Sequence, residues 1–130
     1  MRNRATIFII DRDKILLVHR IKDGKEYYVV PGGGIEPGET EADAAVREAK
    51  EETGLDIVLS EKIGENNTNE GCESFYVAKS WSGTLALGGP EALRQSPTNS
   101  YALEWVPIEK LGDIELKKES QEILLNFLNQ

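Results

Sequence analysis

Residues 33–55 read GGIEPGETEADAAVREAKEETGL, and this stretch decides the fold. Thr40 precedes an alanine-rich run, and threonine is a residue that commonly caps a helix N-terminus. Gly54 stands where a left-handed residue commonly ends a helix. The pattern therefore predicts a helix from Thr40 to Thr53. Its apolar positions recur at helical spacing and should pack on a sheet: Ala42, Ala45, Val46 and Ala49.

Three glutamates of this predicted helix, Glu48, Glu51 and Glu52, are spaced so that they share one face. Carboxylates gathered in this way suit a hard divalent cation, although an acidic helix face is more often only a solvated surface. The glycines at 32–34 favour the metal interpretation. They allow bare backbone to approach a ligand, and their carbonyls are hard oxygen donors. Glycines this close together otherwise indicate a segment without regular structure.

The segments on either side of this stretch read mostly as strands. Residues Asp11–Lys14 are turn-like and separate two aliphatic runs, which predicts a hairpin. We expect strands at 5–10, 15–19, 27–30, 55–63, 73–81 and 101–107, and a second helix at 115–129. This order predicts an α+β fold, an α/β/α sandwich with a mixed sheet, in a single domain over residues 1–130.

The composition of the 130-residue chain excludes several classes of function. No apolar run approaches the roughly 18–20 residues that cross a bilayer, and no secretory cleavage site follows the N-terminus. The single cysteine, Cys72, allows no internal disulfide, so we expect a cytoplasmic protein. A net charge of −8 disfavours binding of nucleic acid through a basic surface.

The segment from Gly33 to Leu55 resembles the Nudix box of the MutT-like Nudix hydrolase family. The box consists of Gly, five residues, Glu, seven residues, Arg-Glu, an aliphatic residue, any residue, Glu-Glu, any residue, Gly and an aliphatic residue. Every fixed position is present: Gly33, Glu39, Arg47, Glu48, Glu51, Glu52 and Gly54. Ala49 is smaller than the usual aliphatic residue, which concerns packing rather than chemistry.

The resemblance implies a Mg²⁺-dependent pyrophosphohydrolase with the α/β/α Nudix fold. Its substrate would be a nucleoside diphosphate linked to another group: a nucleoside triphosphate, a nucleotide sugar, ADP-ribose or a dinucleoside polyphosphate. The metal, Mg²⁺ or alternatively Mn²⁺, would activate a water that attacks phosphorus. The implied ligands are the Gly32 carbonyl and the carboxylates of Glu48, Glu51 and Glu52. A catalytically silent Nudix-type domain that binds a nucleotide as a sensor is the alternative.

The resemblance also implies supporting roles within the box. Arg47 would fix the rotamer of a box carboxylate and belongs to the catalytic set, and Glu39 would brace the loop against the helix. Gly54 would end the helix. Gly33 is expected at the substrate, and so is Arg20, which ends the second predicted strand.

The sequence leaves the general base open. Glu51 or Glu52 could take the proton of the attacking water, or a glutamate outside the box could do so. Of the two outside the box, Glu91 in a glycine-rich loop is preferred over Glu104 on the last strand. The partner is expected to be a small nucleotide derivative rather than nucleic acid or a membrane. The chain would act as a monomer or a homodimer. His19, the only histidine, is interpreted as structural.

Overall fold

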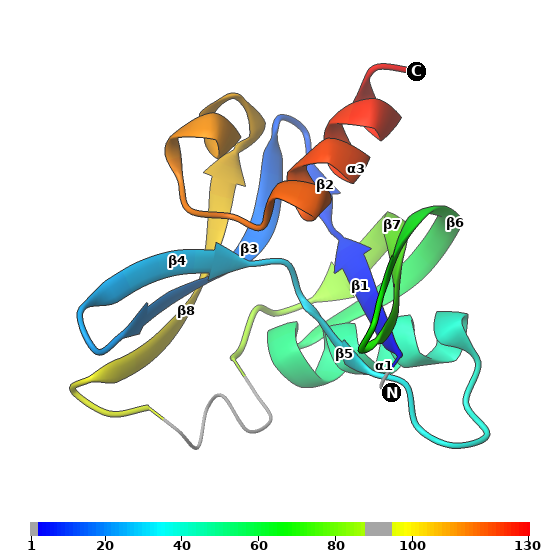
Figure 1. The fold of residues 1–130 in the computed structure, drawn as a ribbon, viewed down its shortest axis with the longest axis horizontal. Coiled ribbons are helices and arrows are strands. Elements are labelled where there is room, and N and C mark those ends of the chain that lie inside the picture. The colour runs from blue at the N-terminus through cyan, green and yellow to red at the C-terminus, as the bar shows by residue number, and fades with distance from the viewer. Residues whose placement is uncertain (1–2, 88–94) are drawn as a thin grey trace.

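The computed structural model describes residues 3–87 and 95–130, which form two four-stranded sheets and helices on both sides of them (Figure 1). The elements in chain order are β1 (Arg4–Phe8), β2 (Ile10–Asp11), β3 (Lys14–Lys22), β4 (Lys25–Val29), β5 (Gly32–Gly34), α1 (Glu41–Thr53), β6 (Leu55–Thr68), β7 (Gly71–Gly83), β8 (Asn99–Pro107), the 3₁₀ helix η1 (Ile108–Asp113) and α3 (Lys118–Leu128).

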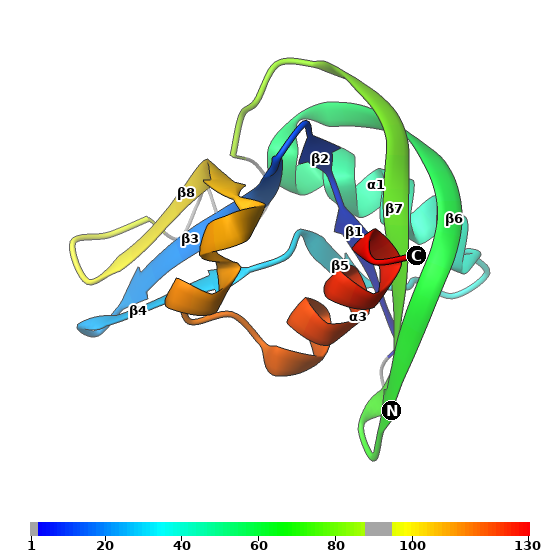
Figure 2. The same cartoon turned by 90° about the horizontal axis from the view of Figure 1, so that it is seen from above.

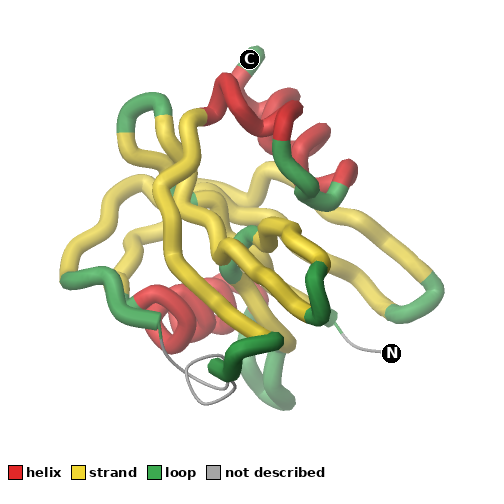
Figure 3. Tube along the Cα trace, turned by 90° about the vertical axis from the view of Figure 1, so that its left-hand side faces the viewer, coloured by secondary structure: helices red, strands yellow, loops and turns green. Residues whose placement is uncertain are grey.

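The first sheet has the strand order β5-β1-β7-β6 and is mixed, because β1 runs parallel to β7 while the other pairs are antiparallel. The second sheet is antiparallel and consists of β2, β3, β4 and β8. Helices α1 and α3 lie on opposite sides of the strands (Figures 2 and 3). The predicted α+β sandwich with a mixed sheet is therefore confirmed.

Two buried clusters fill the sandwich. On one side, the buried alanines of α1 pack with Ala5 and Ile7 of β1. On the other side, Leu124 of α3 packs with Phe8 and with Phe75 of β7. Residues of a strand alternate between faces, so β1 and β7 each supply side chains to both clusters. The small alanines allow α1 to approach the sheet closely.

The predicted strand at 5–10 is wrong as a single element. β1 ends at Phe8, and β2 then begins at Ile10 and pairs with Ile15 in the second sheet. The chain thus changes sheets at Ile9, which is fully buried. An unbroken aliphatic run cannot reveal this change, because both sheets bury the same residue types. The predicted hairpin persists only in its last pairs, Ile10 with Ile15 and Asp11 with Lys14.

The predicted helix over Thr40–Thr53 is confirmed. The Thr40 hydroxyl accepts a hydrogen bond from the Asp43 amide at 3.1 Å, and Gly54 ends the helix with a φ of 81°. Val46 was expected in the buried stripe but is 37% exposed, and Ala44 is buried instead. The stripe is therefore rotated toward Ala44 and Ala45.

Residues Gly32–Gly34 form the strand β5 rather than an irregular segment. They pair antiparallel with β1, with Gly32 opposite Thr6 and Gly34 opposite Arg4. A Cβ at Gly32 would lie 2.8 Å from the Thr6 Cα, so only glycine permits this approach. Pairing with β1 therefore restrains the backbone of these glycines, which have no side chains to do so.

The second predicted helix begins later than expected. The Tyr28 amide donates to the Glu115 carbonyl at 2.8 Å, and Leu116 forms a parallel bridge with Tyr28. Residues 115–116 therefore extend the edge of β4, and α3 begins only at Lys118. None of the helices in the described part of the chain is long and apolar enough to cross a membrane.

Candidate active site

Two glutamates of the box, Glu48 and Glu52, lie against β5. The Gly32 amide donates to Glu52 Oε2 at 3.0 Å, which joins the C-terminal part of α1 to the strand. At Gly33 a Cβ would overlap with the carboxylate of Glu48. The absence of a side chain at Gly33 therefore creates the space in which the Glu48 carboxylate lies.

Arg47 organises the acidic groups around it. Its Nη1 donates to Glu48 Oε1 at 2.9 Å and to Glu51 Oε2 at 3.2 Å. Its Nη2 donates to the Gly34 carbonyl at 3.0 Å, which connects α1 to β5 a second time. Hydrogen bonds from Arg47 are also the main reason that the pKa of Glu39 falls to about 2. Arg47 thus gathers three carboxylates of the box around one guanidinium.

Glu48 has a different electrostatic environment. Its side chain is only 14% exposed, and burial raises its pKa although Arg47 and Arg4 act in the opposite direction. The nearby charge of Glu51 raises it further. A carboxylate whose charge is incompletely compensated in this way would be stabilised by an added cation.

The chemistry of the box fits a hard divalent cation, since Glu48, Glu51 and Glu52 offer only oxygen donors. Within residues 3–87 and 95–130, no three His, Cys, Asp or Glu side chains already surround one point. Glu48 and Glu51 bond to Arg47, and Glu52 bonds to the Gly32 amide. Metal binding by all three would therefore need their side chains to reorient.

The two acids considered outside the box are separated from it. Glu91 lies outside the described residues. Glu104 is on β8 of the second sheet, where its carboxylate bonds to His19 Nδ1. His19 Nε2 lies 3.2 Å from Glu26 Oε2, and the imidazole stacks on Tyr28 with ring centroids 4.4 Å apart. These contacts agree with a structural His19.

Arg20 lies on β3, and its guanidinium packs between two aromatic rings. The Arg20 Cζ is 3.9 Å from the Tyr101 ring centroid and 5.4 Å from that of Tyr27. Its Nη2 donates to Asn99 Oδ1 at 2.7 Å. Arg20 therefore contacts Tyr27, and Tyr27 itself lines a pocket.

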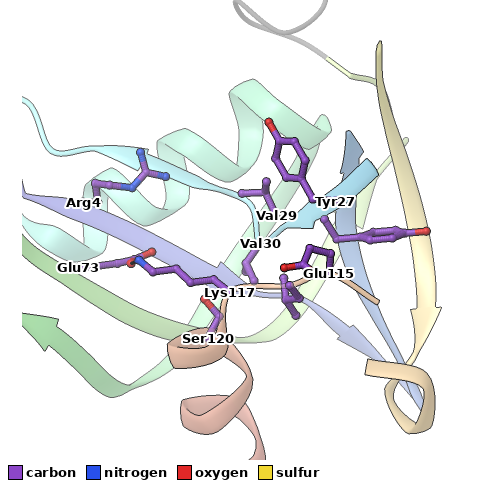
Figure 4. Close-up of a pocket in the computed structure, with 10 residues that line it drawn as sticks. Arg4, Tyr27, Val29, Val30, Glu73, Glu115, Lys117 and Ser120 are labelled. Atoms are coloured by element: carbon purple, nitrogen blue, oxygen red, sulfur yellow. Dashed lines mark hydrogen bonds and ion pairs between the residues drawn. The ribbon is translucent and has the colours of Figure 1, made fainter. Parts of the chain in front are cut away.

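That pocket has a volume of about 450 Å³ and lies between β4, the first sheet and the start of α3 (Figure 4). Val29, Val30 and Leu116 give it apolar walls, and its polar groups include Arg4, Glu73 and Lys117. Arg4 pairs with Gly34 of β5, and its charge acts on Glu48. Arg4 therefore connects the pocket with the box.

The sequence interpretation missed Glu73, Lys117 and Arg4. A signal for Glu73 exists, because Glu73, Phe75 and Val77 alternate on one face of β7 and the latter two are buried in the core. An acid on the core face of a strand indicates a special role. Lys117 offers no such signal, since it occupies a stretch that reads as the first turn of a helix.

The family model of the NUDIX domain matches residues 1–127. The chain therefore belongs to the Nudix family, and the resemblance seen in the sequence is confirmed.

Curated relatives share short, well-matched segments with the chain. It is 48% identical over 60 residues to a "Putative 8-oxo-dGTP diphosphatase" of Bacillus subtilis, a match that covers 46% of this chain and 40% of the relative. It is 53% identical over 49 residues to an "ADP-ribose pyrophosphatase" of Methanocaldococcus jannaschii, which covers 36% and 29%. The chain thus spans less than half the length of these relatives.

Solved structures agree over the whole fold. The ORF135 protein of E. coli superposes with a TM-score of 0.76 at 24% identity, covering 99% of this chain and 89% of that chain. A MutT protein of Bacillus halodurans gives a TM-score of 0.75 at 23% identity, covering 100% and 84%. At this identity the likeness concerns the fold.

Proposed function

We propose that the protein hydrolyses the pyrophosphate linkage of a nucleoside diphosphate that is joined to another group. The observation that carries this proposal is the assembly of the box on one face of α1: Glu48 and Glu51 share the guanidinium of Arg47, and Glu52 bonds to the Gly32 amide of β5. A helix under selection for stability alone would not keep so many like charges together.

The carboxylates of Glu48, Glu51 and Glu52 and the carbonyl of Gly32 would hold Mg²⁺, or alternatively Mn²⁺. The cation supplies neutralisation of the diphosphate oxygens and a water of lowered pKa. Arg47 orients Glu48 and Glu51, and Glu39 orients Arg47. Glu51, Glu52 and Glu91 are the candidate acceptors of the water proton, and a Gln variant of each one tests it. The variant that lacks the acceptor should lose the limb of the pH–rate profile that reports titration of that carboxyl.

The pocket beside the box would accept the nucleoside. Its volume of about 450 Å³ lies in the range usual for small-molecule sites. Arg4 stands between the pocket and Glu48 and would contact the phosphates. Gly33 would leave room for the phosphates near Glu48, and Arg20 would support the pocket through its contact with Tyr27.

The decisive experiment compares Glu52→Gln with Glu61→Gln, a matched change at an exposed position of β6. Phosphate or pyrophosphate release is followed with a panel of nucleoside triphosphates, nucleotide sugars, ADP-ribose and dinucleoside polyphosphates in the presence of Mg²⁺. We expect kcat of Glu52→Gln to fall by roughly two orders of magnitude or more, with wild-type activity in Glu61→Gln. Full activity of Glu52→Gln would contradict the proposal.

The alternative function, a silent nucleotide sensor, predicts a different result. Nucleotides would then bind the wild type without any turnover at every Mg²⁺ and Mn²⁺ concentration tested. The complete set of box glutamates favours the enzyme, since a domain that only binds has no need to retain all of them. A cytoplasmic location, a single domain and a monomeric or homodimeric state stay predictions, which cell fractionation and light scattering can check.

A further inference from the structure

We propose that Glu73 is a specificity-determining residue that selects guanine-type bases in the pocket, together with Lys117. The inference rests on the proposed function, because it assumes that the pocket takes the nucleoside of a nucleotide substrate. It goes further by naming the class of base and the two side chains that read it.

Glu73 is a rigidly held acceptor. Its side chain is 14% exposed and points to the pocket from β7 (Figure 4). The Thr6 hydroxyl, on a residue that is 1% exposed, donates to Glu73 Oε2 at 2.6 Å. The Lys117 ammonium donates to Glu73 Oε1 at 3.0 Å. The buried Thr6 hydroxyl therefore orients the carboxylate, and the Lys117 ammonium, on a side chain that is 53% exposed, supplies a second donor.

This arrangement is poorly explained by stability. Glu73 shares its strand face with the core residues Phe75 and Val77, where a carboxylate is costly to desolvate. The Lys117 side chain is 53% exposed, and an ion pair that solvent reaches contributes little to stability. Each carboxylate oxygen can accept more than one hydrogen bond, so Glu73 can still accept from a ligand. A binding role accounts for its position.

The chemistry of the pair matches one edge of guanine. The Watson–Crick edge of guanine carries two adjacent donors, the ring N1–H and the 2-amino group, beside the O6 acceptor. A carboxylate accepts two parallel donors well, and an ammonium donates to the neighbouring carbonyl. Glu73 and Lys117 supply these two groups side by side, and the apolar walls formed by Val30 and Leu116 suit the flat faces of a purine.

Other bases leave part of the pair unmatched. Adenine and cytosine present only one donor on this edge, the amino group, where guanine presents two. One oxygen of the Glu73 carboxylate would therefore lose its water without gaining a hydrogen bond from the base. Hypoxanthine is the sharpest probe, because it keeps the ring N–H and O6 of guanine and lacks only the 2-amino group. A site that is built around a hydrogen bond discriminates strongly against a ligand that cannot form it.

The first test measures kcat/KM of the wild type for dGTP, dITP, dATP and dCTP with Mg²⁺. We expect dGTP to exceed dITP by roughly tenfold or more. Equal values for dGTP and dITP, or a preference for dATP or dCTP, would overturn the inference. Binding of dGMP and dIMP by calorimetry gives the same comparison without turnover. Absence of hydrolysis across the full panel of nucleoside triphosphates, nucleotide sugars, ADP-ribose and dinucleoside polyphosphates would reject the proposed function, whereas the binding ratio would still decide the role of the pocket.

The second test uses variants. Glu73→Gln should bring the dGTP to dITP ratio close to one, because the amide cannot accept two donors with the strength of a carboxylate. Lys117→Met should weaken dGTP and dITP alike, since both keep O6. Lys118→Met is the matched control, because Lys118 is 84% exposed and lies 3.8 Å from Glu122. A ratio unchanged in Glu73→Gln would overturn the inference. If that variant does not fold, the wild-type ratio for dGMP and dIMP decides.

Discussion

Arg47 and Glu39 are joined by two parallel hydrogen bonds, from Nε to Oε2 at 2.7 Å and from Nη2 to Oε1 at 2.8 Å. The Glu39 Oε1 also accepts from the Glu36 amide at 3.0 Å. The pair therefore ties the loop before α1 to the side chain that orients Glu48 and Glu51. Because both Arg47 and Glu39 are mostly buried, solvent does little to weaken this tie.

The first prediction concerns Arg47→Lys. A lysine keeps the charge but cannot donate two parallel bonds to Glu39. We expect kcat/KM to fall by roughly tenfold or more and the free energy of unfolding to fall by about 1–3 kcal/mol. Pyrophosphohydrolase assays and urea titration measure the two effects. Lys50→Met, on an exposed residue of the same helix, is the control and should change stability by less than about 1 kcal/mol. Unchanged activity in Arg47→Lys would show that the bidentate pair is dispensable.

The second prediction concerns Gly33→Ala. The new Cβ would overlap with the Glu48 carboxylate, so this side chain must move away from β5. We expect a higher Mg²⁺ concentration for half-maximal activity and a lower kcat at saturation. Gly112→Ala is the matched control, because nothing lies within 4 Å of the added methyl group. A Mg²⁺ dependence identical to that of the wild type would argue against Glu48 as a ligand.

The third prediction concerns the end of α1. Gly54 has a φ of 81°, and a Cβ there would lie 2.6 Å from the Thr84 carbonyl oxygen. Gly54→Ala should therefore lower the free energy of unfolding by about 1–2 kcal/mol, or more if the segment around Thr84 cannot adjust. Thermal and urea unfolding measure this loss. The same Gly112→Ala variant should remain within about 0.5 kcal/mol of the wild type.

The fourth prediction concerns stability against pH. Lys62 donates to Glu41 Oε1 at 3.0 Å and to Glu65 Oε1 at 2.5 Å, and these bonds lower the pKa of both carboxyls below 4.5. A lowered folded-state pKa stabilises the protein above the unfolded pKa, and this contribution is lost as the pH falls through the folded value. Lys62→Met should therefore be slightly less stable than the wild type near pH 7, with a lower melting temperature.

The same experiment continues into acid. The difference between Lys62→Met and the wild type should shrink as the pH falls through the lowered pKa values of Glu41 and Glu65, because both carboxyls are then protonated in both proteins. Melting temperatures at several pH values follow this convergence. A difference that stays constant down to pH 3 would assign the effect of Lys62 to packing of its alkyl chain rather than to its charge.

The sequence predicts well what depends on local spacing. The capped helix and the spacing of Glu48, Glu51 and Glu52 are set within a few turns, so they can be read directly from residues 33–55. The split between β1 and β2 cannot, because Gly32 and Phe75, the partners that hold β1 in the first sheet, are distant from it in the chain.

The pocket escaped the sequence interpretation for the same reason. The Tyr28 amide binds the Glu115 carbonyl and α3 begins only at Lys118, so Lys117 lies before the helix, where it meets Glu73. Helical periodicity over 115–129 contains no information on this backbone bond. The aromatic contacts of Arg20 likewise depend on the register among β3, β4 and β8, which places it opposite Tyr27 and Tyr101.

Residues that contact each other within the box are close together in the sequence, whereas those that meet at the pocket are far apart. Glu39 and Arg47 are eight positions apart and Gly32 and Glu52 twenty, whereas Glu73 is 67 positions from Thr6 and 44 from Lys117. Under the proposed function, the metal-binding part of the site can thus be inherited as one uninterrupted stretch of coding sequence. If the pocket selects the base as we propose, substrate preference can change by isolated mutations elsewhere in the gene while the box stays intact.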